Sequence, residues 1–134
     1  MPRVTVEILE GRTPDQKRAL IREIANSVIN VYKVPAKGVA IRIQEVKFTD
    51  LGTGTESYWD FALHDGKVLY GSSGDPRITV TCTERSLDEK KELVKQITDK
   101  VSEILGVPAS DVKIFINEMK KDQFAIGGKL ICDK

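Results

Sequence analysis

The sequence repeats itself once, and this repeat constrains the fold more than any other feature. Segment 2–6 recurs as segment 76–80, and the alternating segment 39–45 recurs as segment 112–118. The offset is 74 residues for the first pair and 73 for the second, so the first half holds one extra residue, which we assign to Gly11. Two copies of this length indicate a duplication, because a solenoid needs more units.

Each copy has the pattern of a strand, a helix and a strand. Apolar and polar residues alternate at the start and at the end of each copy, as they do in half-buried strands. Capping boxes begin the helices, Thr13 with Gln16 in the first copy and Ser86 with Glu89 in the second. A helix between two strands allows parallel pairing through a right-handed crossover. The sequence therefore predicts an α+β fold made of two tandem βαβ units.

The alternation in the later strand of each copy predicts which side chains point away from the helices. These outward positions carry polar, cationic and apolar types: Ala40, Arg42, Gln44, Lys113, Phe115 and Asn117. A sheet with helices on one face must solvate or cover its second face. The mixture favours packing against other subunits with sites in the seams, and a solvated face is the alternative.

The charge balance and the cysteines limit the classes of function. The 21 basic and 20 acidic residues leave no field that favours nucleic acid or an anionic membrane. No apolar run reaches the roughly 20 residues that cross a bilayer, and no signal-like segment opens the chain. Cys82 and Cys132 indicate reduced thiols in a cytoplasmic protein, with a disulfide as the alternative, and the single His64 argues against a histidine metal site.

Pro2 follows the initiator Met1 and suggests a specific chemistry. If Met1 is removed, Pro2 becomes the amino terminus and carries a titratable secondary amine. An α-amino group titrates near pH ~8, and burial in an apolar pocket lowers such a pKa because desolvation penalises the charged form. This amine can take and return a proton near neutral pH. The alternative is that Pro2 is merely compatible with removal of methionine.

Motifs in both halves match one known family. The first half matches in Pro2, in the Ile-Leu-Glu-Gly-Arg of segment 8–12 and in the capped helix that follows. The second half matches in segments 112–114 and 117–120, and above all in the Phe-Ala-Ile-Gly-Gly of segment 124–128. On these residues the chain resembles a tandem fusion of two 4-oxalocrotonate tautomerase units, from the tautomerase superfamily.

The resemblance implies a fold, an assembly and an activity. The two βαβ units would form a four-stranded sheet with both helices on one face, and three fused chains would assemble as a homotrimer. The first unit would span 1–46, a linker 47–75 and the second unit 76–134. The activity implied is that of a tautomerase, an isomerase that moves a proton in a small unsaturated 2-oxo acid of the 2-hydroxymuconate type, with no metal or organic cofactor.

The resemblance also implies the residues of the site. The general base of the family maps onto Pro2, its substrate-carboxylate arginine onto Arg12, and the aromatic residue that keeps the pocket apolar onto Phe124. A second family arginine polarises the substrate carbonyl. This arginine maps onto Lys113 in the second half and onto Ala40 in the first.

The two halves are unequal in these residues. Pro76 lies inside the chain, so its nitrogen is a tertiary amide without a basic lone pair, and the first half is expected to lack a hairpin that matches the one at Phe124. Lys113 in place of arginine keeps the charge but loses the bidentate fork. Arg85 aligns with Arg12 and is either a second substrate-carboxylate contact or a relic exposed to solvent.

Residues 47–75 are the least informative part of the sequence. The Asp-Gly pair at 65–66 lies between two aromatic-rich runs and predicts a β-hairpin turn, within a linker that covers a sheet edge. The alternative is that Tyr58, Trp59 or His64 contributes to the pocket.

Two other functions stay open. A related enzyme of the superfamily would hydrate or dehalogenate a 3-carbon unsaturated acid, and it would need Glu10, Glu118 or Tyr58 to activate water. If Met1 is retained, Pro2 is an amide, and the chain would be a non-catalytic trimeric binding or structural protein.

Overall fold

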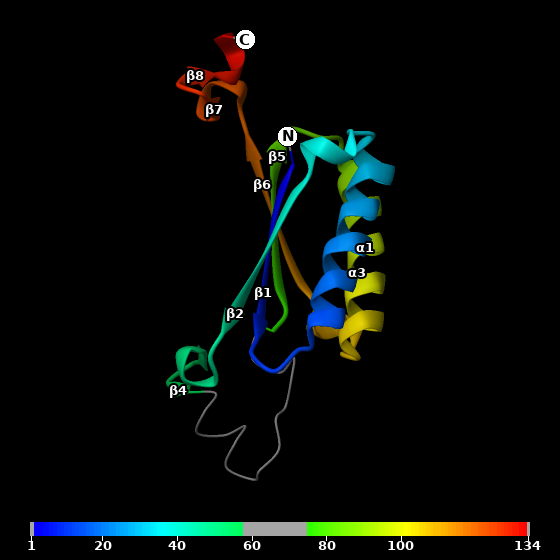
Figure 1. Cartoon of the computed structure of the whole chain (residues 1–134), viewed down its shortest axis with the longest axis vertical. Helices are drawn as coiled ribbons and strands as arrows, with labels where there is room; N and C mark the ends of the chain where they lie inside the picture. The colour runs from blue at the N-terminus through cyan, green and yellow to red at the C-terminus, as the bar shows by residue number, and fades with distance from the viewer. Residues whose placement is uncertain (1, 58–74, 134) are drawn as a thin grey trace.

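The computed structural model describes residues 2–57 and 75–133, which form a sheet with two long helices on one side (Figure 1). The first unit consists of β1 (Arg3–Leu9), α1 (Pro14–Tyr32) and β2 (Ala40–Val46). β1 and β2 pair in parallel, as a crossover through α1 requires. The predicted strand, helix and strand of the first copy are therefore confirmed.

The second unit repeats this arrangement with β5 (Arg77–Thr83), α3 (Leu87–Leu105) and β6 (Lys113–Met119). The two units join edge to edge in a four-stranded sheet of order β2-β1-β5-β6, in which β1 and β5 are antiparallel. Thr5 lies opposite its own repeat equivalent, Thr79. A local twofold axis therefore passes between the units, and the α+β fold of two βαβ units is confirmed.

Short 3-10 turns precede the later strands and follow them, at Ala36–Gly38, Phe48–Asp50, Ala109–Asp111, Lys121–Gln123 and Ile131–Asp133. Both predicted capping boxes form, because the Thr13 and Ser86 hydroxyls accept hydrogen bonds from the third backbone amide of their helices. β1 precedes β5 by 74 residues and α1 precedes α3 by 73, so the extra residue lies between β1 and α1. Gly11 lies there with φ of 108°, which only glycine adopts without strain.

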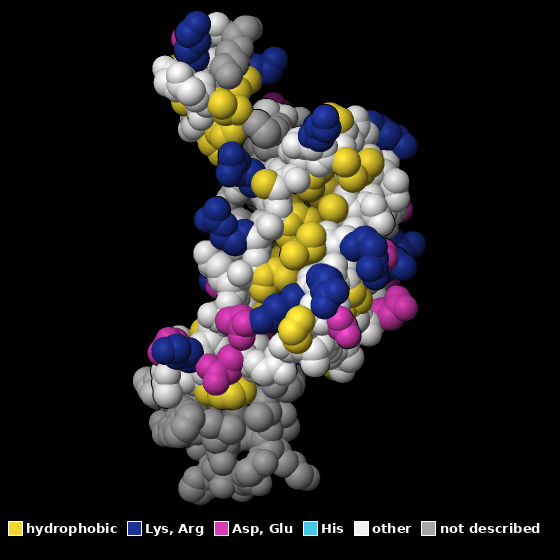
Figure 2. All heavy atoms as spheres, in the orientation of Figure 1, with side chains coloured by type: hydrophobic (Ala, Val, Ile, Leu, Met, Phe, Trp, Pro, Cys, Tyr) yellow, Lys and Arg dark blue, Asp and Glu magenta, His cyan; other side chains and the backbone are white. Residues whose placement is uncertain are grey.

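The core lies between the sheet and the helices, where α1 and α3 pack on each other. One apolar stripe of each helix is buried there, with Leu20, Ile24 and Val28 of α1 and Leu93, Ile97 and Val101 of α3 all fully enclosed. Figure 2 shows hydrophobic side chains that reach the surface in a stripe between the strands and the helices. Removal of such a side chain to alanine costs about 2–5 kcal/mol, so this layer holds the two units together.

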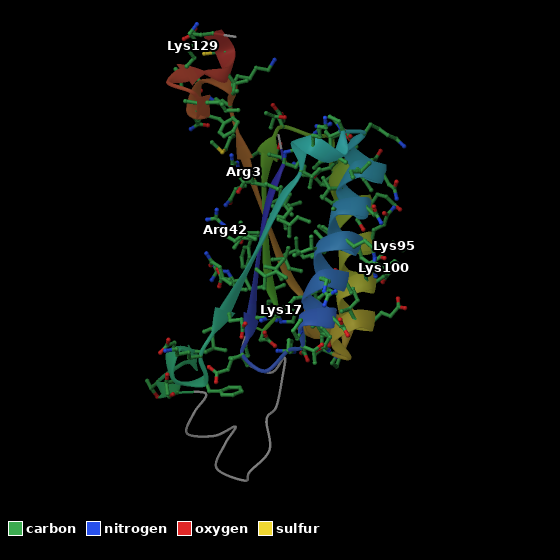
Figure 3. The ribbon with its side chains drawn as sticks, viewed as in Figure 1. Arg3, Lys17, Arg42, Lys95, Lys100 and Lys129 are labelled. Atoms are coloured by element: carbon green, nitrogen blue, oxygen red, sulfur yellow. The ribbon has the colours of Figure 1, made fainter. Side chains whose placement is uncertain are left out.

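The strand parity predicted from the sequence is also confirmed. The apolar positions of β2 and β6 pack towards the core, whereas the alternate positions, which include Ala40, Lys113 and Phe115, are exposed. Arg3 and Arg42 point away from the helices, and Lys95 and Lys100 lie on the helical side (Figure 3). The second face of the sheet is therefore open and carries basic side chains.

Each half ends in a small hairpin, and the expectation that the first half lacks one is wrong. β3 (Gly52–Thr53) pairs with β4 (Glu56–Ser57), as β7 (Ala125–Ile126) pairs with β8 (Lys129–Leu130). The two hairpins extend from opposite ends of the sheet (Figure 1). Leu51 stands in the first half where the second half has Phe124. Sequence reasoning missed this hairpin because Leu51-Gly-Thr-Gly preserves only one glycine of the Phe-Ala-Ile-Gly-Gly motif.

Some predictions fall outside the described residues. The turn at 65–66 and the side chains of Tyr58, Trp59 and His64 belong to this group, and the unit boundaries of 1–46, 47–75 and 76–134 stay a prediction. Among the described residues, neither long helix is apolar enough to cross a membrane.

Candidate functional site

Pro2 lies at the end of the sheet where β5 and β6 finish. It directly precedes β1, is buried, and its carbonyl accepts a hydrogen bond from the Ala40 amide at 3.2 Å. Arg3, the next residue, lies opposite Thr81 of β5. The guanidinium carbon of Arg3 lies 5.6 Å from the ring centroid of Phe124, so the hairpin of the second half reaches the same end as Pro2.

A small apolar hollow of about 30 Å³ lies at this end. Its lining comes from both units: Arg3, Thr81, Cys82, Thr83, Met119 and Phe124. Phe124 therefore contributes apolar surface beside Arg3, the residue that follows Pro2.

Arg85 follows β5 and lies at the same end. Its Nη1 donates a hydrogen bond of 3.1 Å to the Tyr32 carbonyl, and its guanidinium carbon lies 4.7 Å from the Tyr32 ring centroid. Its backbone amide donates to Glu118 at 3.0 Å, and Nη1 lies 3.8 Å from the Glu89 carboxylate. The Arg85 side chain is 22% exposed, so these contacts enclose most of it. We call the group of Pro2, Arg85 and Phe124 the Pro2 end.

Two buried groups beneath Arg85 are held in their neutral forms. Burial raises the pKa of the Tyr32 hydroxyl, and the neighbouring Cys82 raises it further. Burial also raises the pKa of the Cys82 thiol, against the opposing effect of Arg85. Of Tyr32, Cys82 and Arg85, Arg85 therefore carries the charge.

Arg12 lies at the opposite end of the sheet. Its Nη2 donates to the Asp75 carboxylate at 3.0 Å, and the two side chains are only 3% and 2% exposed. Asp75 also accepts a hydrogen bond of 2.8 Å from the Leu9 amide, and Arg12 Nη1 donates to the Leu9 carbonyl at 3.3 Å. The structure therefore does not bring Arg12 to Pro2 within one chain, and it commits the guanidinium to a buried ion pair.

Lys113 begins β6 at this same opposite end. Its backbone amide donates to the Pro76 carbonyl at 3.1 Å, which repeats the bond between Ala40 and Pro2. The exposed Lys113 side chain lines an open hollow of about 290 Å³ together with Glu7, Asp75, Arg77 and Phe115. We call the group of Arg12, Asp75 and Lys113 the Lys113 end. Within one chain, therefore, Lys113 adjoins the internal proline rather than Pro2.

The residues that could activate water in a hydratase or dehalogenase lie at different ends of the sheet. Glu118 lies at the Pro2 end, where a hydrogen bond from Lys90, and secondly one from the Arg85 amide, lower its pKa. Glu10 lies at the Lys113 end, and Tyr58 is outside the described residues. Within residues 2–57 and 75–133, no three metal-ligating side chains gather closely enough to hold a metal ion.

Sequence reasoning missed Tyr32 and Asp75. Tyr32 aligns with Leu105 in the repeat, and Asp75 aligns with Met1. The sequence signal for both residues is the difference between the two copies at these positions. A residue type that occurs in only one copy indicates a contact that only one end of the sheet makes.

Comparison with known proteins identifies the family. The family model described as "Tautomerase enzyme" matches the chain twice, over residues 2–60 and 76–134. The chain belongs to the tautomerase family. It is therefore an isomerase built from two tautomerase units, and the second match begins at the internal Pro76.

Relatives of short length match one unit. A "Probable tautomerase" of Listeria monocytogenes serotype 4b is 44% identical over 54 residues, which is 40% of this chain and 88% of the relative. A "2-hydroxymuconate tautomerase" of Bacillus subtilis is 39% identical over 59 residues, which is 43% of this chain and 95% of the relative.

Solved structures match nearly the whole tautomerase chain. A crystal structure of native fused 4-OT has a TM-score of 0.82 at 20% identity and covers 98% of this chain and 97% of its own. A fused 4-OT described as an asymmetric trimer has a TM-score of 0.80 at 21% identity, with the same coverage. At this identity the likeness establishes the fold.

Proposed function

We propose that this tautomerase moves a proton along a conjugated 2-oxo acid of the 2-hydroxymuconate type, with Pro2 as the general base after removal of Met1. The observation that carries the proposal is the gathering of a buried Pro2, a cationic Arg85 and an aromatic Phe124 at one end of the sheet. The substrate class follows the relatives that are named for 2-hydroxymuconate.

Pro2 supplies the base because only a terminal proline has a basic nitrogen. Its burial favours the neutral amine, since desolvation disfavours the charged form. Phe124 and the apolar hollow exclude water and strengthen this effect. Pro76 has the same place in the other unit, but its nitrogen is an amide and cannot exchange a proton.

Arg85 binds the substrate carboxylate in this proposal. Its contacts with the Tyr32 ring and carbonyl leave its charge uncompensated at hydrogen-bonding distance, since Glu89 is 3.8 Å away. A guanidinium can hold a carboxylate through two parallel hydrogen bonds. Arg12, which the sequence predicted for this role, would first have to be released by Asp75.

Lys113 reaches Pro2 from a neighbouring copy in a homotrimer. The open sheet face carries Lys113 and a Phe115 that is 50% exposed, and packing of copies through this face would cover it. Such packing would place the Lys113 end of one chain against the Pro2 end of the next. An ammonium there would stabilise the negative charge that develops on the substrate oxygen.

The reaction is a balanced proton shift. The neutral Pro2 amine removes a proton from one end of the conjugated system, and the electron pair moves along that system as the oxygen charge develops. Arg85 keeps the carboxylate in register, and Lys113 offsets the oxygen charge. The protonated Pro2 then returns the proton at the other end, so that the amine is neutral again.

The decisive experiment combines mass and kinetics. Intact mass establishes whether Met1 is removed, and ultraviolet absorbance follows ketonisation of the 2-hydroxymuconate dienol. We expect a processed amino terminus, turnover, and loss of turnover in Pro2→Ala. Retention of Met1 in a fully active protein would refute the role of Pro2.

Assembly is tested separately by sedimentation. We expect a trimer at micromolar concentration, because a monomer would leave the apolar part of the sheet face in water. A stable active monomer would refute delivery of Lys113 by a neighbouring copy.

The hydratase or dehalogenase alternative receives less support. A carboxylate that activates water needs a pKa near the working pH. The lowered pKa of Glu118 and its bond with Lys90 make it a poor base.

A further inference from the structure

We propose that Tyr32 is a positioning residue that holds the Arg85 guanidinium ready for the substrate carboxylate. This inference rests on the proposed function, because it assigns a cause to the placement of a residue that acts in it. Tyr32 is the last residue of α1, is 1% exposed, and lies in the first unit, whereas Arg85 belongs to the second.

Two contacts fix the orientation of Arg85. The ring of Tyr32 lies 4.7 Å from the guanidinium carbon, and this stacking restricts the tilt of the guanidinium plane. The hydrogen bond from Nη1 to the Tyr32 carbonyl restricts rotation within that plane. This carbonyl also lies at the carboxyl end of a helix, where the helix dipole attracts a cation.

These contacts hold the cation without neutralising it. A ring face and a carbonyl carry no net charge, and the Glu89 carboxylate lies 3.8 Å from Nη1, beyond hydrogen-bonding distance, so the guanidinium can still bind a carboxylate ligand. The Arg85 Nε is buried and has no hydrogen-bond partner among the described residues. Buried donors are seldom left without partners, so the guanidinium keeps hydrogen-bonding capacity that the described part of the protein does not use.

The Lys113 end provides an internal contrast. There α3 ends in Leu105, which offers no aromatic face, and the equivalent arginine, Arg12, is held by the Asp75 carboxylate at 3.0 Å. Asp75 thus takes from Arg12 the interaction that a substrate carboxylate would seek. Of the two equivalent arginines, Arg85 is the one that the fold orients without a carboxylate hydrogen-bonded to its guanidinium among the described residues.

The Tyr32 hydroxyl has a lesser part in this arrangement. It is buried and has no nitrogen or oxygen partner among the described residues, and it lies beside the Cys82 thiol. Orientation of Arg85 therefore depends on the ring and on the backbone carbonyl, and a phenylalanine can replace the tyrosine in this role.

The kinetic test replaces Tyr32 with leucine, the residue that stands at the equivalent position 105 in the second half. We expect Tyr32→Leu to raise KM roughly tenfold, the scale of one partly buried cation–π contact, with a smaller change in kcat. Tyr32→Phe should restore KM to within about twofold, because the ring remains. Leu105→Ala is the matched control, since it removes apolar volume at the end of the other helix and should lower thermal stability while KM is unchanged.

A double mutant separates positioning from general damage. If Tyr32 acts through Arg85, Tyr32→Leu combined with Arg85→Ala should have the same KM as Arg85→Ala alone. Multiplied effects would overturn the inference. Should Tyr32→Leu not fold, Tyr32→Met fills the space with an adaptable chain that lacks an aromatic ring, and the same outcomes apply.

A spectroscopic readout makes the test independent of turnover. The Nε–H signal of Arg85, assigned by its loss in Arg85→Lys, should carry a ring-current shift in ¹⁵N–¹H spectra of the wild type and of Tyr32→Phe, and should lose it in Tyr32→Leu. An unchanged signal and KM in Tyr32→Leu, with Arg85→Ala still impaired, would overturn this inference alone. An unchanged KM in Arg85→Ala would overturn the carboxylate role in the proposed function together with it.

Discussion

The Pro2 end and the Lys113 end are the same local structure built twice, yet their arginines meet different partners. Arg85 lies on an aromatic ring and a helix-terminal carbonyl, whereas Arg12 is enclosed in an ion pair with Asp75. The Arg85 arrangement leaves the guanidinium able to bind a ligand. In the Arg12 arrangement the guanidinium binds Asp75 and so holds the start of β5 in place. One end is therefore suited to binding and the other to stability.

This difference teaches what fusion permits. In an assembly of identical short chains, every copy of an end has the same residues. In a fused chain each end mutates by itself, so Tyr32 and Leu105, or Ala40 and Lys113, can diverge at equivalent positions. The variants below test whether the ends have divided these tasks.

The largest effect is expected at the two prolines. Pro2→Ala should lower kcat/KM by about 10²–10⁴-fold, the range for loss of a general base, because a primary amine replaces a rigid secondary amine. Pro76→Ala should leave the chemistry largely intact, because an internal amide takes no part in proton transfer. Steady-state ketonisation of the 2-hydroxymuconate dienol measures both. Equal losses would mean that these prolines matter for folding, and would remove the catalytic difference between the ends.

The next effect is expected at Lys113, whose equivalent at the Pro2 end is Ala40. Lys113→Ala should lower kcat by about 10²–10³-fold with a smaller change in KM, because the charge that it offsets appears mainly in the transition state. Lys113→Arg should keep activity, because it retains the charge and adds a fork.

A mixing experiment tests where this lysine acts. Trimers assembled from Pro2→Ala and Lys113→Ala chains should regain part of the activity, because some seams would then join an intact Pro2 end to an intact Lys113 end. Absence of any recovery in confirmed mixed trimers would mean that Lys113 serves its own chain.

The fold was largely predictable because it depends on periodicity. The alternation of β2 and β6, the capping boxes at Thr13 and Ser86, and the extra residue at Gly11 all leave local patterns that the structure confirms. The hairpin Gly52–Ser57 was missed because turns tolerate many sequences when the flanking strand sets their position.

The site was less predictable, because partner choice depends on long-range contacts. No sequence pattern near Arg12 predicts its ion pair with Asp75, because the two residues are 63 positions apart in the chain. Likewise Tyr32 and Arg85 are 53 residues apart and meet only because the antiparallel join of β1 and β5 brings one helix end to the other unit. The repeat correctly aligned the two arginines, and only the three-dimensional contacts distinguish their surroundings.

The two arginines should therefore fail in different ways. Arg85→Ala should raise KM by about 10–100-fold, the scale of a hydrogen bond to a charged group, with little change in thermal stability. Arg12→Ala should destabilise the protein by about 3–5 kcal/mol, because it leaves Asp75 buried and unpaired. Kinetics and denaturant unfolding of both variants measure the contrast. A raised KM in a fully stable Arg12→Ala protein would reverse the assignment of the two ends.

The smallest effect concerns the carboxylates that anchor each unit. Glu45 pairs with Lys17 and Glu118 pairs with Lys90. Within the part of the chain that the structure describes, Glu118 also accepts a hydrogen bond from the backbone amide of Arg85, and Glu45 has no such bond from Arg12. These bonds lower the pKa of Glu118 below its ordinary value of 4.5. Its contribution to stability is therefore present above about pH 4.5 and is lost as the pH falls through the folded-state pKa.

Glu118→Gln removes the charge but keeps an oxygen that can accept the Arg85 amide. We expect it to be slightly less stable than the wild type in urea at pH 7, and the difference to shrink as the pH falls through the folded-state pKa of Glu118, where the native carboxylate becomes protonated as well. Glu45→Gln is the matched control, because it removes the equivalent ion pair without touching an arginine amide, and its difference from the wild type should change less with pH. If the difference in stability between Glu118→Gln and the wild type does not change as the pH is lowered, the carboxylate is not engaged at the Pro2 end in solution. The placement of Arg85 would then depend on the side-chain contacts with Tyr32 and Glu89.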